Sequence, residues 1–123
     1  MITRKAFALP ALAILFAAAL VPSQTRIASA HPAIDIAVAN WKFTPAKIEA
    51  HVGEETTLRF ISSEGVHGVK SDELGIASTM ITPGKTIEVK FTPKKAGTYI
   101  VHCSIMCGSG HEDMKLTVVV ADS

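Results

Sequence analysis

Seven short segments rich in alternating apolar or β-branched residues follow one another between residues 34 and 121. In the clearest, "KTIEVKF" at 85–91, Ile87, Val89 and Phe91 would lie on one face of a strand and the polar residues between them on the other. The remaining segments are 34–40, 48–53, 56–63, 67–71, 97–103 and 115–121. Proline and glycine residues separate several of them, and none has a helical period. The pattern predicts one all-β domain, an antiparallel β-sandwich.

The first thirty residues have a different character. A basic start, "MITRK", precedes the sixteen-residue apolar run "AFALPALAILFAAALV", and Ala28-Ser29-Ala30 ends the stretch. This is the pattern of a secretory signal peptide. The run is shorter than the roughly 20 residues of a spanning helix and contains Pro10, so an uncleaved anchor is the less favoured alternative. We expect a signal peptide at 1–30 and a periplasmic or secreted domain at 31–123.

The charge balance of residues 31–123 excludes one class of partner. The chain has 12 Lys and Arg and 11 Asp and Glu, and three of the basic residues (Arg4, Lys5 and Arg26) lie in the predicted leader. Nine basic residues therefore face 11 acidic ones, and no basic cluster is present. We expect no nucleic-acid binding. Because residues 31–123 hold no second apolar run of spanning length, we expect no stable membrane insertion after cleavage. We also expect a monomer.

Both cysteines of the chain lie in the twelve residues "CSIMCGSGHEDM" at 103–114. Spacings of four, four and three residues would fit one face of a helix. However, Gly108 and Gly110 would each cost about 1 kcal/mol in a helix interior, and strand-like segments flank the stretch. We therefore expect a strand-to-strand loop that curls around a ligand. Its candidate metal ligands are Cys103, Cys107, His111 and Met114.

Two thiolates, an imidazole and a thioether are soft or borderline ligands, which favour copper or zinc over calcium or magnesium. Structural zinc prefers cysteine, histidine or carboxylate, so Met114 is the residue that discriminates between the two metals. Methionine also fills gaps in apolar cores, and this alternative stays open for Met114.

A further ligand is expected upstream. His67 lies in "SSEGVHGVKS", near Gly65 and Gly68 and at a strand end, where the loops of a sandwich gather. His102 directly precedes Cys103 on a strand and should point to the opposite face. His51 is expected at the surface or an edge. His31, the first residue after the predicted cleavage site, offers a weaker alternative in which the terminal amine and the imidazole chelate copper.

The loop resembles, ligand for ligand, the Cys-x3-Cys-x3-His-x2-Met loop of binuclear CuA domains in cytochrome c oxidase subunit II and nitrous-oxide reductase. The similarity extends through "FTPAKIEAHVGEETTLRFISSEGVHGV" and "MITPGKTIEVKFTPKKAGTYIVHC", and covers roughly residues 39 to 121. It implies a Greek-key, cupredoxin-like sandwich and two copper ions. It also implies bridging thiolates from Cys103 and Cys107, one histidine on each copper from His67 and His111, a weak axial Met114, and the backbone carbonyl of Ile105.

The resemblance implies an electron carrier that exchanges single electrons with a redox protein such as a cytochrome or an oxidase. The chain shows neither the membrane hairpin of subunit II nor the large catalytic propeller of the reductase, so we expect no enzyme activity of its own. An alternative is copper storage or delivery during assembly of another copper enzyme, because the same ligands serve both functions.

Other interpretations each leave residues unexplained. A mononuclear copper site does not explain Cys103, structural zinc does not explain Met114, and a Cys103–Cys107 disulfide leaves the histidines as coincidence. The spacing also differs from the Cys-x-x-Cys of thiol–disulfide oxidoreductases. We expect the single tryptophan, Trp41, to contribute core or edge packing. Two interpretations stay open for the acidic residues Glu64, Glu112 and Asp113, namely the border of a small docking patch and a merely solvated loop rim.

Overall fold

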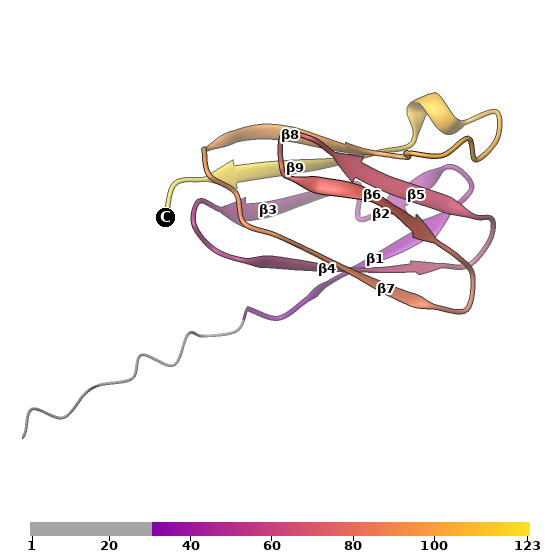
Figure 1. Cartoon of the computed structure of the whole chain (residues 1–123), viewed down its shortest axis with the longest axis horizontal. Helices are drawn as coiled ribbons and strands as arrows, with labels where there is room; N and C mark the ends of the chain where they lie inside the picture. The colour runs from indigo at the N-terminus through magenta and orange to yellow at the C-terminus, as the bar shows by residue number, and fades with distance from the viewer. Residues whose placement is uncertain (1–30) are drawn as a thin grey trace, which may run out of the picture.

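The structure is a computed structural model that describes residues 31–123; the predicted signal peptide lies outside the described residues. Two β-sheets face one another and enclose the core (Figure 1). The first sheet has the order β2-β1-β4-β7, from Lys42–Thr44, Ile34–Ala39, Thr56–Ser62 and Thr86–Phe91. The second has the order β3-β9-β8-β5-β6, from Lys47–His51, Lys115–Ala121, Gly97–His102, His67–Ser71 and Ile76–Ile81.

The all-β sandwich predicted from the sequence is confirmed, and each of the seven expected segments overlaps a strand. Two further strands, β2 and β6, were not expected. β2 has only three residues, too few to show a period. In β6 only the terminal residues Ile76 and Ile81 are buried, and the residues between them do not alternate between apolar and polar.

The expectation of a purely antiparallel sandwich is wrong. β1 pairs in parallel with β4, with Ile36 opposite Phe60, and β3 pairs in parallel with β9, with Ile48 opposite Val118. The other strand pairs are antiparallel. Side-chain alternation reports which face of a strand is buried and not the direction of its neighbour. Here the chain passes from β1 and β2 in one sheet to β3 in the other before it returns in β4, and this crossover permits parallel pairing.

The core fills the space between the sheets with apolar side chains, which alternate with more exposed ones along strands such as β3 and β9. Phe43 and Phe60 contact edge to face, with ring centroids 6.0 Å apart. Leu58 and Leu116 are fully buried beside them. Cys103, Met114 and the imidazole of His67 belong to the same buried interior, so the polar and sulfur groups of the predicted site rest on the core.

Three adjacent strands bring the predicted ligands to one end of the second sheet. β8 lies between β9 and β5 and is antiparallel to both, and its last residue, His102, lies opposite Lys115 of β9 and Lys70 of β5. The chain that follows β8 therefore runs back along the first residues of β5, where Ser104 lies close to Gly68. The loop 103–114 leaves β8 there, and His67 is the first residue of β5. Figure 1 shows this loop, with its short 3-10 helix His111–Asp113, at the end of the sandwich away from the C-terminus.

The loop is closed by the backbone. The Cys103 amide donates a hydrogen bond of 3.2 Å to the Met114 carbonyl, so the first and last residues of the loop are held together. Within residues 31–123, no helix is long and apolar enough to cross a membrane.

The core accounts for the stability of this scaffold. Replacing Phe60 by alanine removes a fully buried ring, and we expect it to lower the free energy of unfolding by about 3–5 kcal/mol in urea titrations of the metal-free protein. Ile61→Ala is the matched control, because the next side chain is 45% exposed; its loss should stay below about 1 kcal/mol. Equal losses for the two variants would contradict this assignment of the core.

Candidate metal centre

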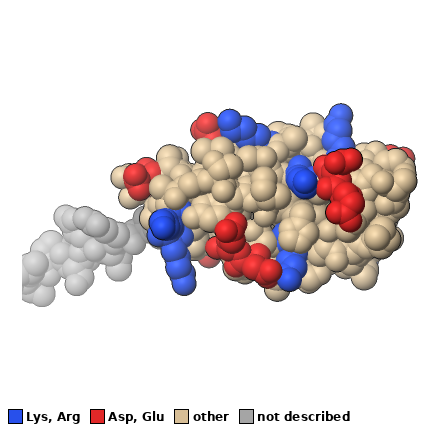
Figure 2. All heavy atoms as spheres, turned by 90° about the horizontal axis from the view of Figure 1, so that it is seen from above, with Lys and Arg blue, Asp and Glu red and all other residues tan. Residues whose placement is uncertain are grey.

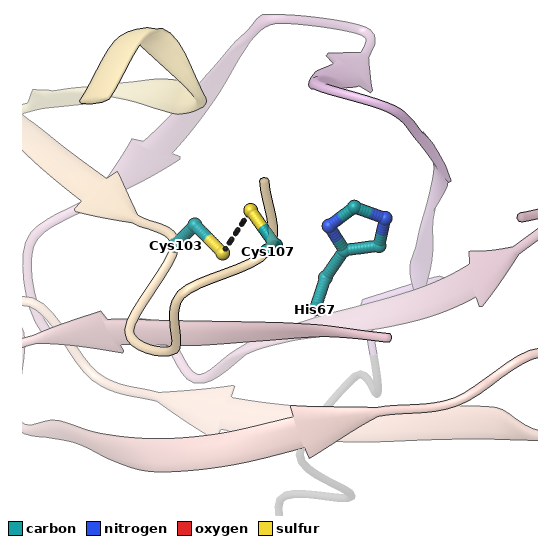
Figure 3. Close-up of side chains that lie close together, drawn as sticks. All are labelled: His67, Cys103 and Cys107. Carbon is teal, nitrogen blue, oxygen red and sulfur yellow. Dashed lines mark hydrogen bonds between the residues drawn. The ribbon is translucent and has the colours of Figure 1, made fainter. Parts of the chain in front are cut away.

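Two cysteine thiols form the middle of the site. The Cys103 Sγ and Cys107 Sγ atoms lie 3.1 Å apart, farther than the ~2.0 Å of a disulfide bond, and both thiols are free. Cys103 is buried and Cys107 is half-buried. Figure 3 shows the two sulfurs facing one another, with the ring of His67 beside Cys107. One ligand atom from each of these three residues lies within 4.8 Å of the others.

His67 has a ring nitrogen that no other described residue satisfies. Its Nε2 lies 2.9 Å from the Glu64 carbonyl oxygen, which can only accept, so Nε2 carries the proton. The second nitrogen, Nδ1, is fully buried and has no hydrogen-bond partner in residues 31–123. Burying an unpaired acceptor is costly. Figure 3 shows this nitrogen turned toward Cys107. Histidines that bind a metal ion through one ring nitrogen commonly donate a hydrogen bond to a carbonyl from the other, and His67 has this arrangement.

The other predicted ligands lie against the two cysteine sulfurs. His111 Nδ1 lies 3.6 Å from Cys107 Sγ, and the fully buried Met114 places its Sδ 3.8 Å from the same atom. The Ile105 carbonyl oxygen lies 3.2 Å from Cys103 Sγ and accepts a hydrogen bond from this thiol. The structure thus brings together all six residues that the sequence and the resemblance predicted, namely His67, Cys103, Ile105, Cys107, His111 and Met114.

The three remaining histidines lie elsewhere. His102 is exposed although its neighbour Cys103 is buried, as expected for successive residues of a strand. His51 is exposed at the end of β3. His31 has its Nε2 3.4 Å from a carboxylate oxygen of Glu54 and lines a shallow cavity near the start of β1.

The surroundings of Cys107 favour its neutral form while no metal is bound. Burial, followed by the hydrogen bond and the charge of Cys103, raises the pKa of this thiol from 9.0 to about 11. A metal ion must therefore displace the thiol proton to bind, and binding is expected to release protons. Two thiols, one thioether and two imidazoles that lie close together form a donor set for soft or borderline metals, and not for magnesium or calcium.

Trp41 contributes to this end of the molecule in a way that the sequence did not reveal. It lies between β1 and β2, is 38% exposed, and donates a 2.9 Å hydrogen bond from Nε1 to the Cys107 carbonyl. The expectation of edge packing is correct, but Trp41 is not a member of the buried core. No local sequence signal connects residues 41 and 107, because the contact depends on the tertiary fold.

The chain belongs to the cupredoxin-like domain family, whose pattern matches residues 11–120. It is similar to cytochrome c oxidase subunit 2 of Thermus thermophilus, with 31% identity over 80 residues that cover 65% of this chain and 58% of the relative. A second subunit 2 protein of this species matches equally well, and the chain spans about half the length of these relatives.

Solved structures agree with this assignment. A heme-copper terminal oxidase dimer matches with 26% identity and a TM-score of 0.62, over 71% of this chain and 63% of the oxidase chain. The periplasmic domain of subunit II of cytochrome oxidase from Bradyrhizobium japonicum matches with a TM-score of 0.65, over 74% of this chain and 84% of that domain. At 15% identity the second match supports the fold alone.

The raised pKa of Cys107 makes the stability of the metal-free protein dependent on pH. A thiol whose pKa rises on folding stabilises the fold below pH 9 and loses this contribution as pH rises from 9 to 11. We expect urea titrations to show that the native protein loses more stability across this window than Cys107→Ser does. A constant difference between the two proteins would contradict the buried, protonated state of this thiol.

Proposed function

We propose that this chain is an exported electron-transfer protein with a binuclear copper centre of the CuA type. The observation that carries the proposal is that His67 Nδ1, which has no hydrogen-bond partner within residues 31–123, lies close to the two thiols, and that the buried Met114 thioether lies beside Cys107. Membership of the cupredoxin-like family and similarity to cytochrome c oxidase subunit 2 support the same conclusion.

Each residue has a proposed role in the site. Cys103 and Cys107 would bridge two copper ions, with His67 and His111 as the terminal ligands. The Met114 thioether and the Ile105 carbonyl would be weak ligands. Such a pair of ions, when bound, supplies a one-electron redox couple. The thioether favours copper over structural zinc, which prefers cysteine, histidine and carboxylate ligands.

The protein's contribution is to hold these groups in place and keep water away. Met114 and His67 are fully buried, and the loop is closed by the hydrogen bond from the Cys103 amide to the Met114 carbonyl. The Glu64 carbonyl fixes the ring of His67 through Nε2. Because the ligands are held in place, they would move little when the metal centre gains or loses an electron. The exclusion of water from the surroundings of the site would tune its reduction potential.

Electrons would enter or leave at the loop end of the sandwich. Exposed apolar side chains border the site, among them Val66 next to His67, and Met106 next to Cys107. Glu112 and Asp113 of the loop are exposed as well. Figure 2 shows a group of Asp and Glu side chains toward this end of the face in view, next to an uncharged surface. We propose a cytochrome or an oxidase as the redox partner, a periplasmic or secreted location, a monomeric state, and no catalytic activity of its own.

Copper delivery to another enzyme is the second candidate. Met106 is 78% exposed and directly precedes Cys107, so a thioether that can bind Cu(I) lies at the entrance to the site. A delivery protein would pass its metal to an acceptor, whereas an electron carrier would keep it.

Metal retention during redox cycling distinguishes the two functions. We expect the copper-loaded protein to accept electrons from a small cytochrome c and to return them over repeated cycles, as monitored by stopped-flow absorbance. During these cycles it should lose no copper to a Cu(I) chelator. His51→Ala, which changes an exposed histidine outside the site, should behave like the native protein. Release of copper to the chelator or to a metal-free acceptor, without electron exchange, would support delivery and reject the carrier.

A further inference from the structure

The turn between β1 and β2 contacts both segments that carry the predicted ligands. On one side, Trp41 Nε1 donates its hydrogen bond to the Cys107 carbonyl, 66 residues away in the sequence. On the other side, the Asn40 amide donates a 3.1 Å hydrogen bond to Oε1 of Glu64. The carbonyl of this same Glu64 accepts the hydrogen bond from His67 Nε2. Two adjacent residues therefore reach Cys107 and, through Glu64, His67.

The loop is shaped to receive the indole. A Cβ atom at Gly108 would lie 2.7 Å from Trp41 Nε1, and one at Gly110 would lie 2.5 Å from Trp41 Cγ, both too close for any side chain. Gly108 also has a φ of +126°, a conformation that other residues rarely adopt. The two glycines between Cys107 and His111 thus let the loop lie directly on the ring of Trp41.

The second contact is equally close. A Cβ atom at Gly65 would lie 2.6 Å from Asn40 Oδ1 and 2.9 Å from His67 Nε2. Asn40, Gly65 and the imidazole of His67 therefore pack against one another without space for another atom. Ser62 also holds this segment, because its hydroxyl oxygen lies 3.0 Å from the carbonyl oxygens of both Glu64 and Gly65, and the two carbonyls share its single proton.

We propose that the Asn40–Trp41 turn is a bracket that fixes the position of Cys107 relative to His67, and that Trp41 and Glu64 are positioning residues of the metal centre. The proposal rests on the proposed function where it concerns copper. Trp41 lies outside the buried core, so its loss should loosen the loop and leave the sandwich intact. The bracket joins the two halves of a site whose ligands come from separate segments, one at the start of β5 and one after β8.

The first test needs no metal. Trp41→Phe keeps an aromatic ring but removes the N–H donor to the Cys107 carbonyl. We expect faster hydrogen–deuterium exchange, by about three- to tenfold, at the loop amides of His111, Asp113 and Met114, which bond to loop carbonyls. The urea midpoint of the metal-free protein should stay near that of the native protein. Unchanged exchange in the loop would overturn the bracket.

Tyr99→Phe is the matched control, because it also removes a ring donor to a backbone carbonyl, the 2.7 Å bond to Lys95, at the start of β8 away from the loop. It should leave exchange at residues 111–114 unchanged. If Tyr99→Phe accelerated exchange there as much as Trp41→Phe, the effect would be global loosening, and the proposal would fail.

The second test uses the copper-loaded protein. We expect Trp41→Phe and Glu64→Ala each to shift the visible absorption spectrum and to speed copper release to a chelator by about three- to tenfold, while Glu64→Gln, which keeps an acceptor for the Asn40 amide, restores the native rate. Native release rates and spectra in both single variants would overturn the bracket. If the native protein itself bound no copper, the proposed function would fail, and the exchange experiment would still decide on the bracket.

Discussion

The buried Nδ1 atom of His67 is the constraint on which the site depends. The Glu64 carbonyl fixes the proton on Nε2, so the other nitrogen presents a lone pair to the interior, next to two thiols. A fold that leaves such an acceptor unpaired carries a cost, which a metal ion would offset on binding. The proposed copper centre explains this atom together with the cluster of sulfurs, whereas an apolar core explains neither.

The sandwich creates the site by the order of its strands. β8 lies between β5 and β9 and runs antiparallel to both, so three chain positions far apart in sequence meet at one end of one sheet. The interior beneath is closed by apolar side chains such as Leu116 and Val101. The candidate ligands of the loop 103–114 and His67 therefore pack on the same apolar interior. The bracket of Asn40 and Trp41, which belongs to the other sheet, connects them.

The sequence predicted the sandwich and the set of side chains that gather at one end of it because both depend on local pattern. Alternation identified the strands, and the spacing of sulfur and nitrogen ligands identified the loop; the contribution of Ile105 came from the family resemblance. The parallel pairing of β1 with β4 and the strand β6 were missed, since neither leaves a local signal. Trp41 was missed as a contact of the loop for a similar reason: its partners Gly108 and Gly110 are brought to it only by the fold.

The central claim, that these residues hold a pair of copper ions, is tested most directly by electron paramagnetic resonance of the copper-loaded, partially oxidised protein. We predict a hyperfine pattern from one electron shared equally by two copper nuclei, and its loss in Cys107→Ser. A pattern from a single copper nucleus, or zinc retained with no copper signal, would contradict the binuclear centre.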